Sequence, residues 1–310
     1  MYNFRTDLAD ERSDIYKKAN KIEEIPGIIT EEQKVDEKIK ITRVKIQSQE
    51  GAESLGKPIG NYITIDIKKL NILTEEEIEK VIECTANEIK ARIDELSGEK
   101  DDILVVGLGN EAVTPDALGP KVVKNIEITR HIIKYLPQYI DENSRPVSAV
   151  APGVLGTTGI ETLEIIQGVV NNIKPKLLIV IDALASRSME RISSTIQIAD
   201  TGIVPGAGVG NSREELSKRT LGIPVIAIGI PTVVETAVVV NEALDLLIEK
   251  YQQEAKSNET LNKIKEEDNY QEIKEALMPK EYNFIVTPKE IDELIKNMAK
   301  IVSKAMNRAF

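Results

Sequence analysis

The sequence predicts an α/β fold in which a twisted, mainly parallel sheet carries helices on both of its faces. From residue 103 onward, short apolar runs typical of buried parallel strands alternate with segments of helical periodicity. The clearest run, residues 103–106, leads into Gly107-Leu108-Gly109-Asn110, a pattern typical of a strand that turns sharply toward a helix. Alternating segments upstream predict an N-terminal β-hairpin extension, and an amphipathic stretch at the end predicts a C-terminal helix.

The composition indicates one large globular domain. Of the 310 residues, 41% are hydrophobic and 29% are charged, which is the ordinary range for a globular protein. No apolar run reaches the roughly 18 residues that a membrane span needs, and the charged N-terminus lacks the apolar core of a signal peptide. We therefore expect a cytoplasmic protein without membrane contacts. Cys84 is the single cysteine, so no disulfide is expected within the chain.

The charged residues exclude several classes of function. The formal net charge is −11, and basic residues are dispersed among acidic ones, which gives little electrostatic support for direct binding of nucleic acid. The single histidine, His131, lies within a helical pattern at residues 121–136, so the chain lacks the histidines of a zinc site. Any chemistry must therefore depend on carboxylates or lysines.

The first hundred residues predict an arm, a hairpin and a long helix. Residues 1–14 are polar and aperiodic, which predicts a mobile arm that leads into a short helix. Alternation at residues 38–47 and 61–68 predicts two strands, joined by a long loop at residues 48–60. A capping box that begins at Thr74 then opens a helix that continues to Gly98.

The remaining elements follow as strand and helix in alternation. We expect helices at residues 117–136, 160–170 and 233–248, and strands at residues 147–151, 177–181, 195–199 and 224–228. The glycine-rich stretch at residues 152–159 suits either a ligand-binding loop or a plain turn. Residues at about 249–280 are charged and helical, which predicts a solvated surface excursion, and a capping box at Thr287 opens the last helix.

Two aspartates stand out because each follows a predicted parallel strand. Asp116 belongs to Thr114-Pro115-Asp116, a helix-opening pattern after the strand at 103–106, and Asp182 follows the most hydrophobic strand of the chain. Ligands of open α/β sheets bind at this edge, so both side chains are expected to face one crevice. If they interact, one carboxyl titrates above the other, and the pair can act as general acid and base. Helix capping is the structural alternative for both.

Metal and nucleotide binding remain weaker alternatives at the same edge. Two carboxylates could hold Mg²⁺ or Ca²⁺, but no histidine follows either strand, which lowers the case for a transition metal. The Gly107-Leu108-Gly109 turn has Ala112 where a dinucleotide-binding loop has its third glycine, and it lacks the acidic residue about 20 positions on. We expect no metal and no cofactor.

At these residues the sequence resembles the germination protease family of spore-forming bacteria. The resemblance covers nearly the whole chain. It is carried by residues 5–9 (RTDLA), 107–110 (GLGN) with 114–120 (TPDALGP), 151–154 (APGV), 181–185 (IDALA) with 187–191 (RSMER), 200–203 (DTGI) through 208–211 (GVGN), and 286–292 (VTPKEID).

The resemblance implies a self-processing endopeptidase that degrades small acid-soluble spore proteins during germination. It implies a homotetramer in the interior of the developing and germinating spore, with residues 1–7 as a propeptide and residues 8–310 as a single peptidase domain. It assigns the catalytic roles to Asp116 and Asp182. Family substrates are cut after an acidic residue and before a large apolar one, so cleavage of the arm is expected between Asp7 and Leu8. Acidification is the expected trigger, since it would protonate these carboxylates.

Two other classes of function stay open at this stage. The related hydrogenase-maturation proteases bind nickel with carboxylates and a histidine, so the first alternative is a metal-dependent peptidase of that type, although His131 is not an evident ligand. The second alternative is a non-enzymatic binding scaffold, which the retention of both aspartates disfavours. Asp200-Thr201-Gly202 occurs once, without the strand-loop context of pepsin-like enzymes, and is interpreted as a turn.

Overall fold

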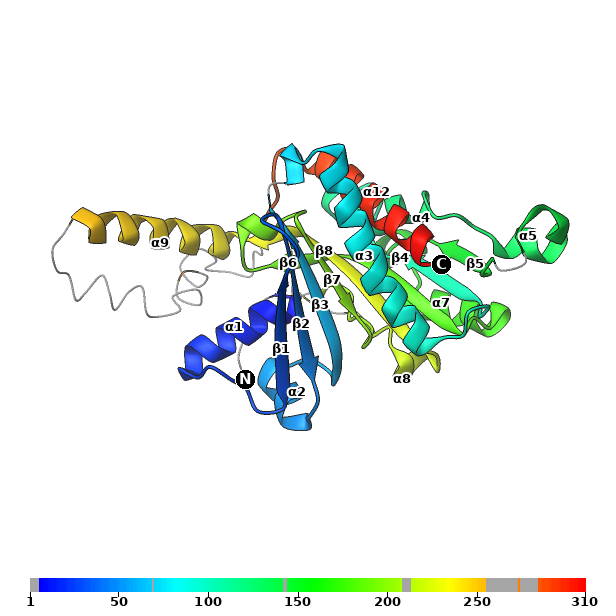
Figure 1. The fold of residues 1–310 in the computed structure, drawn as a ribbon, viewed down its shortest axis with the longest axis horizontal. Coiled ribbons are helices and arrows are strands. Elements are labelled where there is room, and N and C mark those ends of the chain that lie inside the picture. The colour runs from blue at the N-terminus through cyan, green and yellow to red at the C-terminus, as the bar shows by residue number, and fades with distance from the viewer. Residues whose placement is uncertain (1–5, 69, 142–143, 208–212, 255–272, 274–283) are drawn as a thin grey trace.

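A mixed β-sheet is the centre of the structure (Figure 1). The computed structural model describes residues 6–68, 70–141, 144–207, 213–254, 273 and 284–310. In this part of the chain, the strands lie in the order β1-β2-β3-β7-β8-β6-β4-β5, and β9 pairs with β8. Their bounds are β1 Ile28–Lys34, β2 Ile39–Ile46, β3 Gly60–Ile67, β4 Ile103–Gly107, β5 Val147–Val150, β6 Leu177–Ser186, β7 Thr195–Ala199, β8 Val225–Glu235 and β9 Ile285–Val286.

The parallel part of the sheet coincides with the apolar runs of the sequence. Strands β8, β6, β4 and β5 pair in parallel, whereas β1, β2, β3 and β7 form an antiparallel extension that joins β8. The expected α/β class, with helices on both faces, is confirmed. Among the described residues, the α-helices are α1 Ala9–Asn20, α2 Gln49–Leu55, α3 Glu75–Leu96, α4 Leu118–Val123, α5 Arg130–Tyr135, α6 Leu155–Thr158, α7 Thr162–Ile173, α8 Lys218–Leu221, α9 Thr236–Glu254 and α12 Ile291–Ala309.

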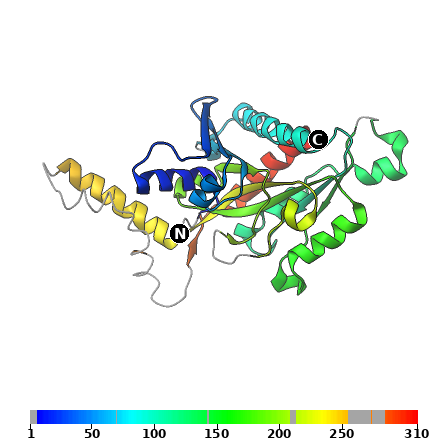
Figure 2. The same ribbon diagram turned by 90° about the horizontal axis from the view of Figure 1, so that it is seen from below.

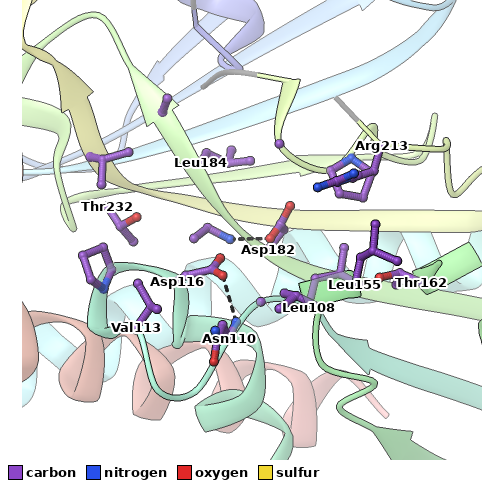
Figure 3. Close-up of a pocket in the computed structure, with 18 of the residues that line it drawn as sticks. Leu108, Asn110, Val113, Asp116, Leu155, Thr162, Asp182, Leu184, Arg213 and Thr232 are labelled. Carbon is purple, nitrogen blue, oxygen red and sulfur yellow. Dashed lines mark hydrogen bonds between the residues drawn. The ribbon is translucent and has the colours of Figure 1, made fainter. Parts of the chain in front are cut away.

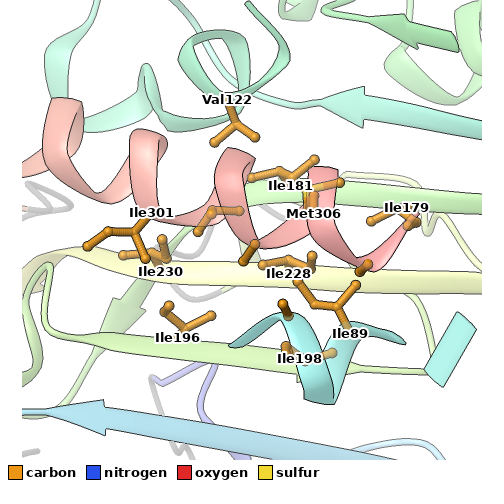
Figure 4. Packing of buried hydrophobic residues seen from close by; sticks show 14 of the residues in the cluster. Ile89, Val122, Ile179, Ile181, Ile196, Ile198, Ile228, Ile230, Ile301 and Met306 are labelled. Carbon is orange, nitrogen blue, oxygen red and sulfur yellow. The ribbon is translucent and has the colours of Figure 1, made fainter. Parts of the chain in front are cut away.

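Alternate residues of the parallel strands bury opposite faces of the sheet. Ile103 and Val105 belong to the core under α3 and α12, together with Ile181 and Ile228 (Figure 4). The intervening residues of β4 and β6 pack instead against α7, and Figure 2 shows α7 on the side opposite α3 and α12. Because both faces are covered, β4 and the first five residues of β6 are continuously apolar, which is why the sequence revealed them.

The N-terminal region departs most from the sequence-based expectation. From Thr6 onward the arm is packed against the rest of the protein rather than mobile, since Thr6, Leu8 and Ala9 are fully buried and α1 begins at Ala9. Strand β1 was not predicted, and it makes the hairpin a three-stranded unit. Its side chains are almost all exposed at the sheet edge, so the sequence lacks the alternation that marks a half-buried strand. Helix α2 occupies part of the segment expected as a loop.

Other element boundaries also differ, including the start of the last helix, which begins at Ile291 without a side-chain cap rather than with a capping box at Thr287. The helix expected at residues 117–136 is two helices, because Thr129 binds Arg145 O and Val147 N and so ties the intervening turn to the start of β5. Strands β6 and β8 continue beyond their expected ends, to Ser186 and Glu235. The charged excursion at 249–280 lies mostly outside the described residues, which include α9 to Glu254. No helix in the described ranges is both long and apolar enough to cross a membrane.

The turn after β4 depends on a close backbone contact with α4. A Cβ atom added at Gly107 would lie 2.2 Å from Gly119 O, and one added at Gly119 would lie 2.3 Å from Leu108 O. These separations are far below a van der Waals contact, and the atoms they involve belong to the backbone, so they cannot move aside without a shift of the turn or the helix. The two glycines therefore set the distance between α4 and the end of β4.

We expect Gly119→Ala to lower the free energy of unfolding by about 1–3 kcal/mol, the usual cost of overpacking a tight contact. Gly168→Ala is the matched control, because Gly168 lies in α7 with no atom within 4 Å of its added Cβ. That substitution should stabilise the protein by roughly 0.5–1 kcal/mol, since alanine favours a helix more than glycine does. Urea unfolding measures both. Equal stabilities of Gly119→Ala and the wild type would contradict the packing argument.

Candidate active site

A cavity of ≈ 420 Å³ lies at the carboxyl ends of the parallel strands (Figure 3). The loop after β4, the glycine-rich loop after β5, and the extended ends of β6 and β8 all contribute to its walls. Asp116 and Asp182 both line it, so the expectation that they face one crevice agrees with the geometry. Gly153 and Gly156 also line it, which places the glycine-rich loop at the site rather than at a distant turn.

Asp116 is positioned by the turn that leaves β4. The backbone N–H of Asn110 donates to Asp116 Oδ2 at 2.8 Å and to Asp116 O at 3.0 Å. Gly109 has φ +110, and a Cβ atom there would lie 2.0 Å from Asp116 O, so the position requires glycine. Burial raises the pKa of Asp116 above its ordinary value, and the hydrogen bond from Asn110 lowers it by a smaller amount.

Asp182 is the more deeply buried of the two aspartates. It lies within β6, not after its end, and β4 stops at Gly107 opposite Ile181, so Asp182 is the first residue of β6 beyond the end of that neighbour. Its side chain is 6% exposed, and Ala183 N–H donates to its Oδ1 at 2.9 Å. Burial raises the pKa of Asp182 well above its usual value, and the nearby carboxylates of Asp116 and Asp7 raise it further.

Asp7 brings the N-terminal arm into this cavity as a third carboxylate. Its backbone N–H donates to Ala185 O at 3.1 Å, and Ala185 N–H donates to its Oδ2 at 3.0 Å. The arm therefore lies against the extended end of β6, next to Asp182. The two residues predicted to flank the cleaved bond, Asp7 and Leu8, are thus at the edge of the cavity and buried beside it, respectively.

Polar contacts on both sides of Asp7 fix the arm. Arg12 Nε donates to Thr6 O at 2.9 Å, and Glu11 accepts hydrogen bonds from Thr6 Oγ1 and from Arg187 N–H. Arg191 forms an ion pair with Asp10 at 2.7 Å. Burial raises the pKa of Glu11 to about 7, although the positive charge of Arg191 opposes the rise.

Gln197, which lines a neighbouring cavity, contacts the arm next to the site, and the sequence did not reveal it. Its Nε2 donates to Asp7 O at 3.0 Å, and its Oε1 accepts from Ala9 N–H at 2.7 Å. Nothing in the local pattern distinguishes Gln197 from a polar residue on a half-buried strand, because its contacts depend on how the arm folds back over the sheet. The hydrogen bonds between the Ala185 backbone and Asp7 could not be predicted from the sequence for the same reason.

Other residues considered from the sequence lie outside the cavity. His131 is exposed on α5, and Asp200 accepts a hydrogen bond from Asn61 N–H in the turn after β7. Neither lines the cavity. Within the described ranges, no group of three His, Cys, Asp or Glu side chains is placed to hold a metal ion. The arrangement places the buried carboxyl group of Asp182 in one cavity with the half-buried Asp116, and carboxyl groups that interact in this way can share a proton and act as acid and base together.

Comparison with known proteins relates the chain to germination proteases. The family model of germination proteases matches residues 5–264 and 260–310. The germination protease of Clostridium perfringens is 48% identical over 316 residues, which cover 100% of this chain and 95% of that protein. The germination proteases of Caldanaerobacter subterraneus and a Geobacillus species are 48% and 41% identical, each across 100% of this chain and 94% of the relative.

The buried state of Asp182 predicts how stability changes with pH. Because its pKa is raised on folding, the folded chain keeps this proton to a higher pH than the unfolded chain does. The group's contribution to stability is therefore present at low pH and is lost as pH rises above the ordinary carboxyl value of about 3.9 toward the folded value. We expect Asp182→Asn to raise the free energy of unfolding relative to the wild type, by an amount that grows from about pH 4 to pH 7.

Denaturant unfolding of both chains across this pH range measures the difference. Asp102→Asn is the control, because Asp102 is a partly exposed carboxylate paired with Arg130, and its substitution should give no gain that grows with pH. A constant difference between Asp182→Asn and the wild type across the range would contradict the burial argument.

Proposed function

Because the chain belongs to the germination protease family, we propose that it is an endopeptidase, made as a self-processing zymogen, that degrades small acid-soluble spore proteins during spore germination. In this proposal it acts as a homotetramer in the interior of the developing and germinating spore. The observation that carries the proposal is the position of Asp7, which lies in one cavity with Asp116 and Asp182. The family's substrates are cut after an acidic residue, and the arm presents such a residue to both aspartates.

In the proposed reaction, Asp116 and Asp182 act on one water molecule. The ionised carboxylate takes a proton from the water, whose oxygen attacks the carbonyl carbon of Asp7. The neutral carboxyl then gives its proton to the nitrogen of Leu8 as the C–N bond breaks, which leaves a new carboxyl group on Asp7 and an amine on Leu8. The stronger rise in pKa at Asp182 favours it as the neutral acid and favours Asp116 as the base.

The buried arm also explains how the zymogen would remain inactive. A segment tethered beside the cavity has a high effective concentration and excludes other peptides as long as it stays docked. Thr6 and Leu8, on either side of Asp7, are fully buried, so a protein substrate has no access to this part of the site. Removal of residues 1–7 would take the Asp7 carboxylate out of the cavity.

Acidification would favour processing through two groups. The pair of aspartates needs one proton to act as acid and base, and the raised pKa of Asp182 means that it gains this proton at a higher pH than an ordinary carboxyl group does. Glu11, whose pKa is about 7, becomes neutral as pH falls below neutral and loses its attraction to Arg191. The processing rate is therefore expected to rise as pH falls from neutral.

We expect the full-length chain, incubated at mildly acidic pH, to yield chains that begin at Leu8. Asp116→Asn and Asp182→Asn keep the size of each side chain but remove the acid or the base, so each should slow processing on the order of 10²- to 10⁴-fold while the chain stays folded. N-terminal sequencing and intact mass measure the product, and circular dichroism measures the fold. Asp200→Asn, which changes an aspartate outside the cavity, is the control.

A new terminus elsewhere, or near-normal processing by a folded Asp182→Asn chain, would overturn the proposal. The same incubation with a metal chelator separates it from a nickel-dependent peptidase. Processing should continue under chelation; its loss, with recovery on addition of nickel, would replace the aspartate mechanism with the metal-dependent one. Cleavage of a purified small acid-soluble spore protein by the processed chain tests the proposed substrate.

A further inference from the structure

We propose that Gln197 is a catalytic residue of the self-processing reaction, in which its side-chain amide holds the peptide bond to be cut and stabilises the oxyanion that forms on Asp7 O. The inference rests on the proposed function, because it takes the bond between Asp7 and Leu8 as the reacting bond. It concerns a residue outside the pair of aspartates and assigns to it a distinct task, the stabilisation of developing negative charge.

The two hydrogen bonds of Gln197 enclose the bond that is proposed to break. Nε2 donates to the carbonyl oxygen of Asp7 at 3.0 Å, and Oε1 accepts from the N–H of Ala9 at 2.7 Å. The carbonyl of Asp7 is the group that water would attack, and Leu8 carries the leaving nitrogen. A single side chain thus binds the backbone on both sides of Leu8, which fixes the carbonyl and limits rotation of the bond.

The sheet register aligns Gln197 with Asp182. Gln197 pairs with Gly229 across β7 and β8, and Gly229 pairs with Asp182 across β8 and β6. Residues in register on adjacent strands point to the same face, and their neighbours in sequence, such as Ile198, Ile228 and Ile181, belong to the core on the opposite face. Two strand spacings, roughly 10 Å, separate Gln197 from Asp182.

The side chain of Leu184 occupies the space over Gly229, between these two side chains. Gly229 has no side chain of its own, and a Cβ atom there would lie 2.3 Å from Leu184 Cδ1. Leu184 therefore lies over β8 at this point, where it lines the cavity together with Asp7. The arm crosses the sheet at this level: the carbonyl oxygen of Asp7 accepts a hydrogen bond from Gln197 Nε2, and its carboxylate accepts one from Ala185 N–H.

A neutral amide suits the task chemically. As water attacks, the carbonyl double-bond electrons move to Asp7 O, and the N–H of Gln197 already points at this atom within the 2.7–3.1 Å range that is effective for an oxyanion donor. The amide of Gln197 does not gain or lose a proton in the reaction, so it does not interfere with the proton transfers of Asp116 and Asp182. When the C–N bond breaks, the electrons return to the carbonyl and the hydrogen bond weakens again.

Docking of the arm does not depend on Gln197 alone. Thr6 is held by Arg12 and Glu11, Asp7 by Ala185, and Asp10 by Arg191. Loss of the Gln197 amide should therefore leave the arm in place, and a slower reaction would then report on the chemistry. This separation allows a catalytic role to be distinguished from a purely structural one.

The test measures the rate of self-processing in full-length chains with Gln197→Met and Gln197→Asn. Met preserves length and bulk but cannot donate, whereas Asn keeps the donor on a side chain that is one methylene shorter. We expect Gln197→Met to process at least about 10²-fold more slowly than the wild type, the usual loss for one oxyanion donor, and Gln197→Asn to be intermediate. A packing role predicts the reverse order, with Met closer to the wild type.

Hydrogen exchange of residues 6–12 supplies the second readout. The proposal expects protection to persist in Gln197→Met at every one of these residues except Ala9, whose N–H donates to Gln197 itself, because the other contacts of the arm remain. Gln167→Met is the matched control: Gln167 Nε2 donates to Thr220 O on the face covered by α7, and its substitution should leave processing within about threefold of the wild type. If Gln197→Met does not fold, the processing rate of Gln197→Asn is compared with that of the wild type, and the proposal expects it to be at least about tenfold lower.

Three results would overturn the assignment to Gln197. The first is a processing rate of Gln197→Met within about threefold of the wild type. The second is faster processing by Gln197→Met than by Gln197→Asn. The third is a loss of hydrogen-exchange protection in the arm of Gln197→Met that matches its loss of processing rate. Failure of the proposed function appears separately, in the wild type and Asp182→Asn alone. If the wild type yields no chain that begins at Leu8, the endopeptidase proposal falls before any Gln197 variant is measured.

Discussion

The burial of Asp182 beside two other carboxylates is the constraint on which the rest of the site depends. Because Asp182 is only 6% exposed, ionisation of its carboxyl group is costly, and the charges of Asp116 and Asp7 increase that cost. The cavity therefore favours states in which the carboxylates share protons. Such sharing makes one group an acid while another stays a base, and it links the charge of the arm to the charge of the site.

The scaffold produces this arrangement through strands of unequal length. β4 ends at Gly107, whereas β6 and β8 remain paired beyond that point. Asp182 therefore lies on a part of β6 that β4 no longer covers, and its side chain lines the cavity. Gly109 lets the departing turn bring Asp116 back toward the same space. On the other side, the antiparallel β7 carries Gln197 in register with Asp182, and the arm lies across this row. The parallel and antiparallel parts of the sheet thus supply different components of one site.

The sequence predicted what depends on local patterns and missed what depends on distant contacts. Continuous apolar runs revealed the parallel strands and the α/β class, the capping box at Thr74 revealed the helix that follows it, and two aspartates after strands indicated the crevice. The polar edge strand β1 gave no periodic signal, and the extension of β6 to Ser186 depends on pairing with β8. Gln197 and the docked arm could not be predicted, because Ala9 and Gln197 are 188 positions apart and meet only through the fold.

The most direct test of the account is the titration of Asp182 by carbon-13 NMR in the full-length chain and in the chain from which residues 1–7 have been removed. Burial and Asp116 should keep the pKa of Asp182 above the ordinary carboxyl value of about 3.9 in both forms. Removal of the Asp7 carboxylate should lower that pKa, because one of the charges that raises it is gone. An ordinary pKa in both forms, or one unchanged by loss of the arm, would contradict the account of three interacting carboxylates.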